Sequence, residues 1–356
     1  HAAIDGVSGA EILETILDST VEPRVVEPEP EGSLSQAIPS TLDLARRGLA
    51  AMALNPLELL RTVPRSLSYL DRLPGAANFP VTGLISDVAG FVSRAMGQSA
   101  PDVEARGLHA PRTILNGTIT AHRRFAFGSA PLDDVKRVKT HFDMTVNDVV
   151  MAMTASALRR WFLDHDALPS VPLVAAVPVS IRTEDQGGDH GNQVSVMLAE
   201  MPTHLGGAEE RLLFMRESMA EAKRQFDAVP ATLLQDLSAL IPTALSGLAA
   251  RALFRLAALP GVLFNLFVSN VPGPQLRLYI AGARVEGIYP VSAVTDLTGG
   301  LNITLFSYDG KLDFGLTACR EMVPDVWNLI GYLEEALAEL VALVPPPRRR
   351  RSPRRA

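Results

Sequence analysis

The block of residues 301–319 constrains the fold more than any other stretch of the chain. It reads "LNITLFSYDGKLDFGLTAC", with two largely apolar runs on either side of Asp309 and Gly310. An Asp-Gly pair between two such runs is typical of a two-residue hairpin turn, because both turn positions need a positive φ. The block therefore predicts two antiparallel strands, and the fold has to include a sheet that holds them.

Patterns typical of helices and of strands interleave through the rest of the chain. Apolar residues that recur every three to four positions predict helices over residues 8–18, 41–54, 56–73, 131–142, 146–165, 208–226, 231–258 and 323–344. Alternating or continuously apolar runs predict strands over residues 113–127, 171–181, 192–201, 266–274 and 276–291. This mixture, with antiparallel hairpins at the end, predicts an α/β or α+β fold with a mixed sheet.

Charge and cysteine content exclude several classes of protein. The net charge is −6, and the last nine residues carry six Arg, so the preceding 347 residues sum to −12. Such a body repels nucleic acid, and no nucleic-acid partner is expected. Cys319 is the only cysteine, which excludes a disulfide framework and a cysteine zinc site and fits a cytoplasmic protein. The longest uncharged stretch, residues 256–276, holds three prolines and predicts buried core or an interfacial helix rather than a membrane span.

The chain opens with "HAAIDGVSG", in which His1, Asp5 and Gly6 have the spacing His-x-x-x-Asp-Gly. Ser8 with Glu11 three residues later forms a capping box, so the preceding residues are expected to be a loop that enters a helix. A loop of this kind can hold an imidazole as a general base, and Asp5 can fix the loop by accepting backbone N–H bonds. The alternative is a solvent-exposed terminal residue beside an ordinary Asp-Gly turn, and the spacing alone leaves both open.

A second pair of polar residues, Asn147 and Asp148, lies in "MTVNDVVMA". Both are candidates for a site at the start of the helix predicted over 146–165. The alternative is a capping pair formed by Thr145 and Asp148, since a negative charge is favoured in the first turn of a helix.

A third motif, "FVSNVPGP", places Ser269 and Asn270 at the end of an apolar run, directly before Val271, Pro272 and Gly273. Polar groups after such a run can face a cavity, or they can mark only a rigid strand exit. The chain contains no GxGxxG, Walker loop, GxSxG or HExxH pattern, and no metal site is expected. The chemistry that remains is based on histidine.

Four segments taken together resemble one family, the bacterial wax ester synthase/diacylglycerol acyltransferases. This family lies within the CoA-dependent acyltransferases, which include chloramphenicol acetyltransferase. Its motif His-His-x-x-x-Asp-Gly is matched by "HAAIDG" from the second His onward, and "TVNDVV", "SNVPGP" and "GGLNITLFSYDGKLDFGL" follow in the family's order. The resemblance covers roughly residues 1–345, and it implies that an N-terminal portion with the first His precedes this sequence.

The resemblance implies a two-domain fold with mixed sheets and a channel between its halves. Residues 1–110 are then the remainder of the N-terminal acyltransferase domain, with an acidic, Pro-rich linker over 19–40 and connecting helices. Residues 111–345 are the C-terminal domain, and residues 346–356 are a disordered Arg-rich tail.

The resemblance also assigns roles and substrates. It places His1 and Asp5 in the catalytic motif, with His1 as the base that activates a diacylglycerol or long-chain alcohol for attack on acyl-CoA. Asp5 shapes the loop. The residues expected to shape the site are Gly6, Asn147, Asp148, Ser269, Asn270, Pro272 and Gly273. Acyl-CoA is a cosubstrate, and neither a metal nor another cofactor is required.

Three alternatives remain open at this stage. The apolar segments and the Arg tail are expected either to contact an inner membrane or lipid droplets, or to be ordinary core helices and a disordered tail. The second alternative is that the chain is an acyltransferase of the same fold that acts on a polyketide or glycolipid hydroxyl. The third is that it is a truncated or cleaved piece with no activity of its own, which binds lipid or works only with its missing half.

Overall fold

The structure is a computed structural model, and it describes residues 110–180, 194–227 and 263–345 together with residues 9, 12, 13, 15–25, 40, 43 and 46. The strands are β1 (Arg123–Pro131), β2 (Leu173–Ser180), β3 (Val194–Met201), β4 (Leu266–Val271), β5 (Tyr279–Ile280), β6 (Ala283–Arg284), β7 (Leu301–Tyr308) and β8 (Lys311–Cys319). The helices are α5 (Leu132–Phe142), α6 (Val146–Asp164), α7 (Ala208–Asp227) and α10 (Val326–Ala342).

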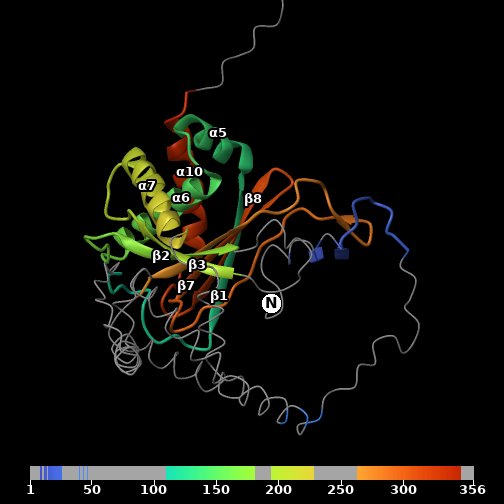
Figure 1. Cartoon of the computed structure of the whole chain (residues 1–356), viewed down its shortest axis with the longest axis horizontal. Helices are drawn as coiled ribbons and strands as arrows, with labels where there is room; N and C mark the ends of the chain where they lie inside the picture. Colours follow the sequence, from blue (N-terminus) through green and yellow to red (C-terminus); the bar gives the residue numbers. More distant parts are fainter. Residues whose placement is uncertain are drawn as a thin grey trace, which may run out of the picture.

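Six strands form one mixed sheet in the order β1-β8-β7-β4-β2-β3 (Figure 1). β8 is antiparallel to β1 and β7, and β2 is antiparallel to β3, whereas β4 runs parallel to both of its neighbours, β7 and β2. The β7–β8 hairpin turns at Asp309 (φ 41°) and Gly310 (φ 77°), as the Asp-Gly pair predicts. The prediction of an α/β fold with a mixed sheet is confirmed.

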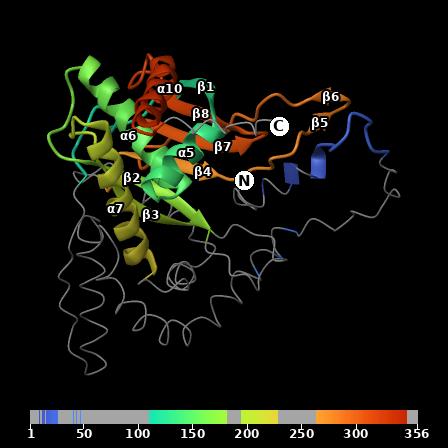
Figure 2. The same ribbon diagram turned by 90° about the horizontal axis from the view of Figure 1, so that it is seen from above.

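Helices α5, α6, α7 and α10 cover one face of this sheet (Figure 2). Side chains alternate between the two faces along each strand, so Leu266 and Val268 of β4 lie in the helix-covered core and Asn270 follows them on the same face. Trp161 and Phe162 of α6 are fully buried. A helix that is apolar around most of its surface belongs in the middle of a layer, and α6 contacts α5, α7 and α10.

Residues 272–290 leave the sheet as an arm that carries the hairpin β5–β6 (Figures 1 and 2). The hairpin turns at Ala281 (φ 50°) and Gly282 (φ 82°), the two positive φ angles that a two-residue turn needs. At its tip the arm meets the N-terminal segment, where Asp18 forms a β-bridge with Tyr279.

Two predicted strands are wrong in extent. The strand predicted over 113–127 occupies 123–131 instead, because residues 113–122 form turns and bends held by contacts such as the bond from Ile119 N–H to Asp296 (2.7 Å). The strand predicted over 276–291 is reduced to β5 and β6, because the arm leaves the sheet and is held by isolated bonds, such as Ile288 N–H to Asp313 (2.7 Å).

The helices predicted over 131–142, 146–165, 208–226 and 323–344 are confirmed within a few residues at each end. The described residues between Gly9 and Ile16 are helical, as predicted. The helices predicted over 41–54, 56–73 and 231–258, most of the linker and the Arg-rich tail lie outside the described residues.

Candidate active site

The carboxyl ends of β2, β4 and β7 meet at one edge of the sheet, because these three neighbouring strands are parallel. The start of α6 lies at the same edge. Its last turn is at the opposite edge, where the Trp161 indole N–H donates to Asp325 (3.0 Å), just beyond the end of β8 at Cys319. Ligands bind beyond the carboxyl ends of strands in parallel α/β sheets, so we place the candidate site here.

The sheet opens between β2 and β4 at this edge. The two strands pair at only two positions, the first of them between Ala175 and Leu266. β4 stays paired with β7 as far as its last residue, Val271. In this described part of the sheet, the backbone edge of residues 269–271 that faces β2 therefore has no strand partner.

Ser269 and Asn270 lie at this opening, on opposite faces of the sheet. Ser269 pairs with Thr304 on the face away from the helices, and Asn270 pairs with Leu305, which is in the helix-covered core. Both side chains are half-buried, and neither makes a hydrogen bond to a residue that the structure describes. Their hydroxyl and amide donors are available to a ligand.

Asp148 and Asn147 differ in what their side chains bind. The Asp148 carboxylate accepts the backbone N–H of Thr145 (2.7 Å), and the Asp148 N–H donates to Thr145 Oγ1 (3.1 Å). This is a capping box, so the capping alternative describes Asp148. Asn147 is half-buried, with no side-chain hydrogen bond to the described part of the chain.

Pro272 and Gly273 turn the chain out of β4 against the end of β7. A Cβ on Gly273 would lie 2.3 Å from the ring of Phe306 and 2.4 Å from the carbonyl oxygen of Ser307, so only glycine fits. The Gly273 N–H also donates to Ser307 Oγ (3.1 Å). The exit of the chain after Asn270 is thereby fixed.

The remaining predicted site residues, His1, Asp5 and Gly6, lie outside the described residues. Among the residues that the structure does describe, no group of three or more His, Cys, Asp or Glu is placed to bind a metal ion. Within the same ranges no helix combines the length and the apolar character needed to cross a bilayer.

A row of polar side chains on the sheet face opposite the helices was not predicted from the sequence. The hydroxyl oxygens of Ser292 and Thr304 are 2.9 Å apart, and Thr304 donates to Asn302 Oδ1 (2.8 Å). Because Thr304 is paired with Ser269, this row runs to the opening beside β4. Its signal was present in "LNITLF", where Asn302 and Thr304 alternate with apolar residues.

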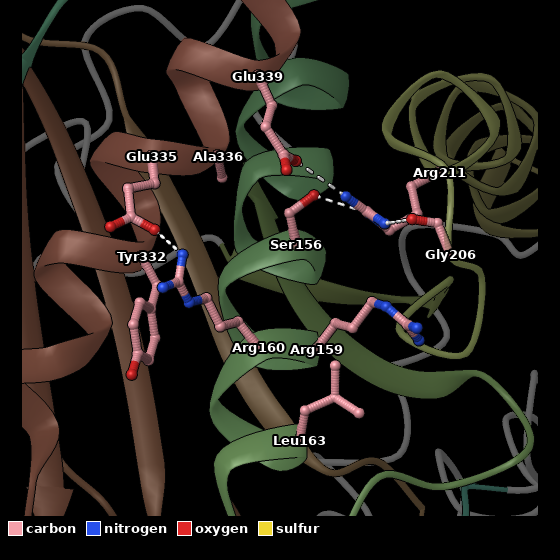
Figure 3. A pocket seen from close by; sticks show the side chains of 10 residues that line it. All are labelled: Ser156, Arg159, Arg160, Leu163, Gly206, Arg211, Tyr332, Glu335, Ala336 and Glu339. Atoms are coloured by element: carbon pink, nitrogen blue, oxygen red, sulfur yellow. Dashed lines mark hydrogen bonds and ion pairs between the residues drawn. The ribbon is translucent and has the colours of Figure 1, made fainter.

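A hollow of about 200 Å³ lies on the outer side of the helices, between α6, α10 and the start of α7 (Figure 3). Its charged groups bind one another: Arg211 donates to Ser156 Oγ (2.8 Å) and Glu339 (3.1 Å), and Arg160 is paired with Glu335. Burial lowers the pKa of the Arg211 guanidinium, and the Glu339 carboxylate partly offsets this. These groups therefore connect α6, α7 and α10 to one another, and their charges are already paired.

Two family profiles match the chain. The profile of the wax ester synthase/diacylglycerol acyltransferase catalytic domain matches residues 1–150, and that of the WS/DGAT C-terminal domain matches residues 190–341. Both profiles therefore describe one class of protein, the wax ester synthase/diacylglycerol acyltransferases.

Individual relatives support the same assignment. The O-acyltransferase WSD of Acinetobacter baylyi is 32% identical over 341 residues, which are 95% of this chain and 68% of that protein. The wax ester synthase/diacylglycerol acyltransferase structure from Marinobacter aquaeolei VT8 has 31% identity and a TM-score of 0.60, covering 95% of this chain and 66% of that chain. This chain belongs to the wax ester synthase/diacylglycerol acyltransferase family, which confirms the predicted family and its fold.

The chain is shorter than these relatives. A Mycobacterium tuberculosis relative is 34% identical over 342 residues, which are 96% of this chain and 62% of that protein. The chain thus spans less than two thirds of that relative's length.

Proposed function

We propose that the chain is part of an O-acyltransferase that moves a long-chain acyl group from acyl-CoA to diacylglycerol or a long-chain alcohol, with His1 as the general base. Family membership supports the reaction class. The observation that carries the proposal is the opening beside β4, where Ser269 and Asn270 keep polar side chains that no described residue binds.

In the proposed reaction His1 removes the proton from the acceptor hydroxyl while that oxygen attacks the thioester carbonyl of acyl-CoA. The charge that develops on the carbonyl oxygen needs hydrogen-bond donors, each of which lowers the barrier by roughly 3 kcal/mol. The C–S bond then breaks, and the His1 imidazolium gives its proton to the departing CoA thiolate. The scheme requires neither a metal nor another cofactor.

One donor to this oxyanion comes from Ser269 or Asn270. Because the two side chains lie on opposite faces of the sheet, only one of them faces the reacting carbonyl. Asp5 and Gly6 shape the loop after His1. The residues that shape the carboxyl-end site are Asn147, Pro272 and Gly273, with Asp148 acting through the cap of α6.

The test is transfer of the acyl group from palmitoyl-CoA to diacylglycerol or hexadecanol by the whole chain, read as CoA release and ester formation. His1→Ala is expected to lower kcat by roughly a thousandfold or more, since it removes the base. His122→Ala is the matched control, because it also removes a histidine, but one that is exposed. The His122 ring lies 3.4 Å from Glu321. Equal rates for His1→Ala and the unsubstituted chain would refute the assignment of the base.

We further propose that the protein is cytoplasmic and contacts the inner membrane or lipid droplets peripherally, since its acceptors do not dissolve in water. The Arg-rich tail is suited to anionic headgroups. Deletion of residues 348–356 is expected to weaken binding to liposomes that contain anionic lipid. Unchanged binding would remove the tail from this role.

We also propose the division into residues 1–110, 111–345 and 346–356. The six-stranded sheet and the four helices that cover it all come from residues 123–342, which supports the boundary near residue 110. Limited proteolysis that leaves a fragment beginning near residue 110 would agree with this division, and cleavage within β1 or α5 would not.

A further inference from the structure

The N-terminal segment and the arm are joined although they are far apart in sequence. The Asp18 N–H donates to the Tyr279 carbonyl (2.8 Å), and the Tyr279 N–H donates to the Asp18 carbonyl (2.7 Å). Beside this bridge, Leu17 is 8% exposed and packs in an apolar cluster with Leu278, Phe306 and Tyr308. Figures 1 and 2 show the N-terminal segment, in blue, next to the hairpin at the tip of the arm.

We call the contact of Leu17 and Asp18 with Leu278 and Tyr279 the docking point, and the hydroxyl of Tyr308 holds the arm there. Tyr308 is fully buried, and its Oη accepts the Leu278 N–H (2.9 Å) and donates to the Val285 carbonyl (3.0 Å). These two residues flank the β5–β6 hairpin, and they are also bonded to each other through Val285 N–H and the Leu278 carbonyl (2.9 Å). The one hydroxyl therefore fixes both sides of the base of the hairpin.

The end of β7 connects the docking point with the candidate active site. Phe306 lies so close to Gly273 that a Cβ on Gly273 would be 2.3 Å from the Phe306 ring. Phe306 also pairs with Val271 of β4. Two residues further along the same strand, Tyr308 contacts the cluster that holds Leu17. A short piece of one strand thus contacts both the turn after Asn270 and the N-terminal segment.

We propose that Tyr308 is a positioning residue: by holding the arm against Leu17 and Asp18, it sets the place of the N-terminal segment relative to the turn that follows β4. The motif that contains His1 immediately precedes this segment in sequence, so the role rests on the proposed function. A displaced base slows the chemical step, whereas binding of acyl-CoA does not depend on it.

Tyr308→Phe tests the role, because it removes the hydroxyl and keeps the ring in the cluster. Tyr332→Phe is the matched control, since it removes a tyrosine hydroxyl that is bonded to Asp164 at the other edge of the sheet. The whole chain is used for amide hydrogen exchange of residues 12–18 and for the kcat and KM of palmitoyl-CoA with hexadecanol. In Tyr308→Phe alone, exchange at Leu17 and Asp18 is expected to be roughly tenfold faster. In the same variant, kcat is expected to be about tenfold lower than in the unsubstituted chain, and KM is expected to stay within about twofold.

A second pair of variants repeats the test from the N-terminal side. Leu17→Ala weakens the cluster, and Ile16→Ala makes the same kind of change at a neighbour that is 63% exposed. Only Leu17→Ala is expected to reproduce the lower kcat and the faster exchange.

Unchanged exchange in Tyr308→Phe, or faster exchange with unchanged kcat, overturns the positioning role. An equal fall of kcat in Tyr332→Phe, or a change in KM alone, also overturns it. If the unsubstituted chain releases no CoA, the proposed function fails and the positioning role fails with it. The proposed function stands, and only the positioning role fails, if His1→Ala abolishes transfer while Tyr308→Phe leaves it unchanged.

Discussion

Asn265 and Asn270 lie at the two ends of β4 and use their amide groups in opposite ways. Asn265 is fully buried, accepts the Val174 N–H (2.9 Å), and donates to the Pro111 carbonyl (2.6 Å) and to Asn116 Oδ1 (2.9 Å). Asn270 is half-buried, and its side-chain amide bonds to no described residue. The amide at the amino end of the strand belongs to the fold, and the one at the carboxyl end is available to a substrate.

Asn265→Ala is expected to have the largest effect on stability. It leaves the Val174 N–H and the Pro111 carbonyl without their partner, and each such buried group costs about 1–3 kcal/mol. We expect the free energy of unfolding to fall by about 3–4 kcal/mol, measured by urea denaturation. Asn270→Ala is the matched control and is expected to change it by less than about 1 kcal/mol. An equal loss in both variants would remove the distinction between the two ends.

Ser269→Ala and Asn270→Ala sharpen the comparison at the carboxyl end. One of the two is expected to lower kcat by roughly a hundredfold, about 2.7 kcal/mol, because it removes a donor to the oxyanion. The KM for palmitoyl-CoA is expected to stay within about twofold, since the donor acts in the transition state. If neither variant lowers kcat by more than about threefold, the oxyanion donor lies elsewhere.

Gly273→Ala tests the rigidity of the turn that follows. The added methyl group overlaps the Ser307 carbonyl oxygen and the Phe306 ring, and such overpacking typically costs 1–3 kcal/mol, so a loss of about 2 kcal/mol is expected. Gly331→Ala in α10 is the control, because a Cβ there meets nothing within 4 Å and stabilises the helix by roughly 0.5–1 kcal/mol. Changes of the same sign, read from thermal unfolding, would contradict the geometry at Gly273.

The smallest effects are expected at the start of α6. Asp148→Ala removes half of the capping box and is expected to lower the free energy of unfolding by about 1 kcal/mol. Asn147→Ala is expected to change it by less than about 0.5 kcal/mol, because its side chain has no partner in the described chain. A larger loss from Asn147→Ala would show that its amide serves the fold after all.

Local chemistry made much of this fold predictable. The Asp309–Gly310 turn and the capping pair of Thr145 and Asp148 follow from the needs of neighbouring backbone groups, which any sequence shows directly. The arm was predicted as a long strand because its residues alternate like one. Whether such a segment joins a sheet depends on partners distant in sequence, and its pattern does not name them.

The sequence predicts which residues belong to the candidate site, but it does not predict what their side chains bind. The motif around Ser269 and Asn270 indicated a site, yet only the register of β4 against β7 shows that the two side chains lie on opposite faces. The row at Asn302 and Thr304 was missed although the two residues alternate with apolar ones, because β7 is buried on both faces and the alternation does not show which partners the polar side chains meet. For Asp148 the sequence favoured capping over a role in the site, and the hydrogen bonds with Thr145 show the cap.

The place of β8 between β1 and β7 bears on the order in which the sheet can form. Among the described strands, β1 pairs only with β8. Pro131 of β1 is paired with Lys311 of β8, which is synthesised much later. The strands β2, β3, β4 and β7 are synthesised before β8 and pair with one another, whereas β1 has to wait for β8 before it can join them. We therefore expect β1 to join the sheet late in folding, and synthesis that stops before Lys311 to leave β1 as an unpaired strand.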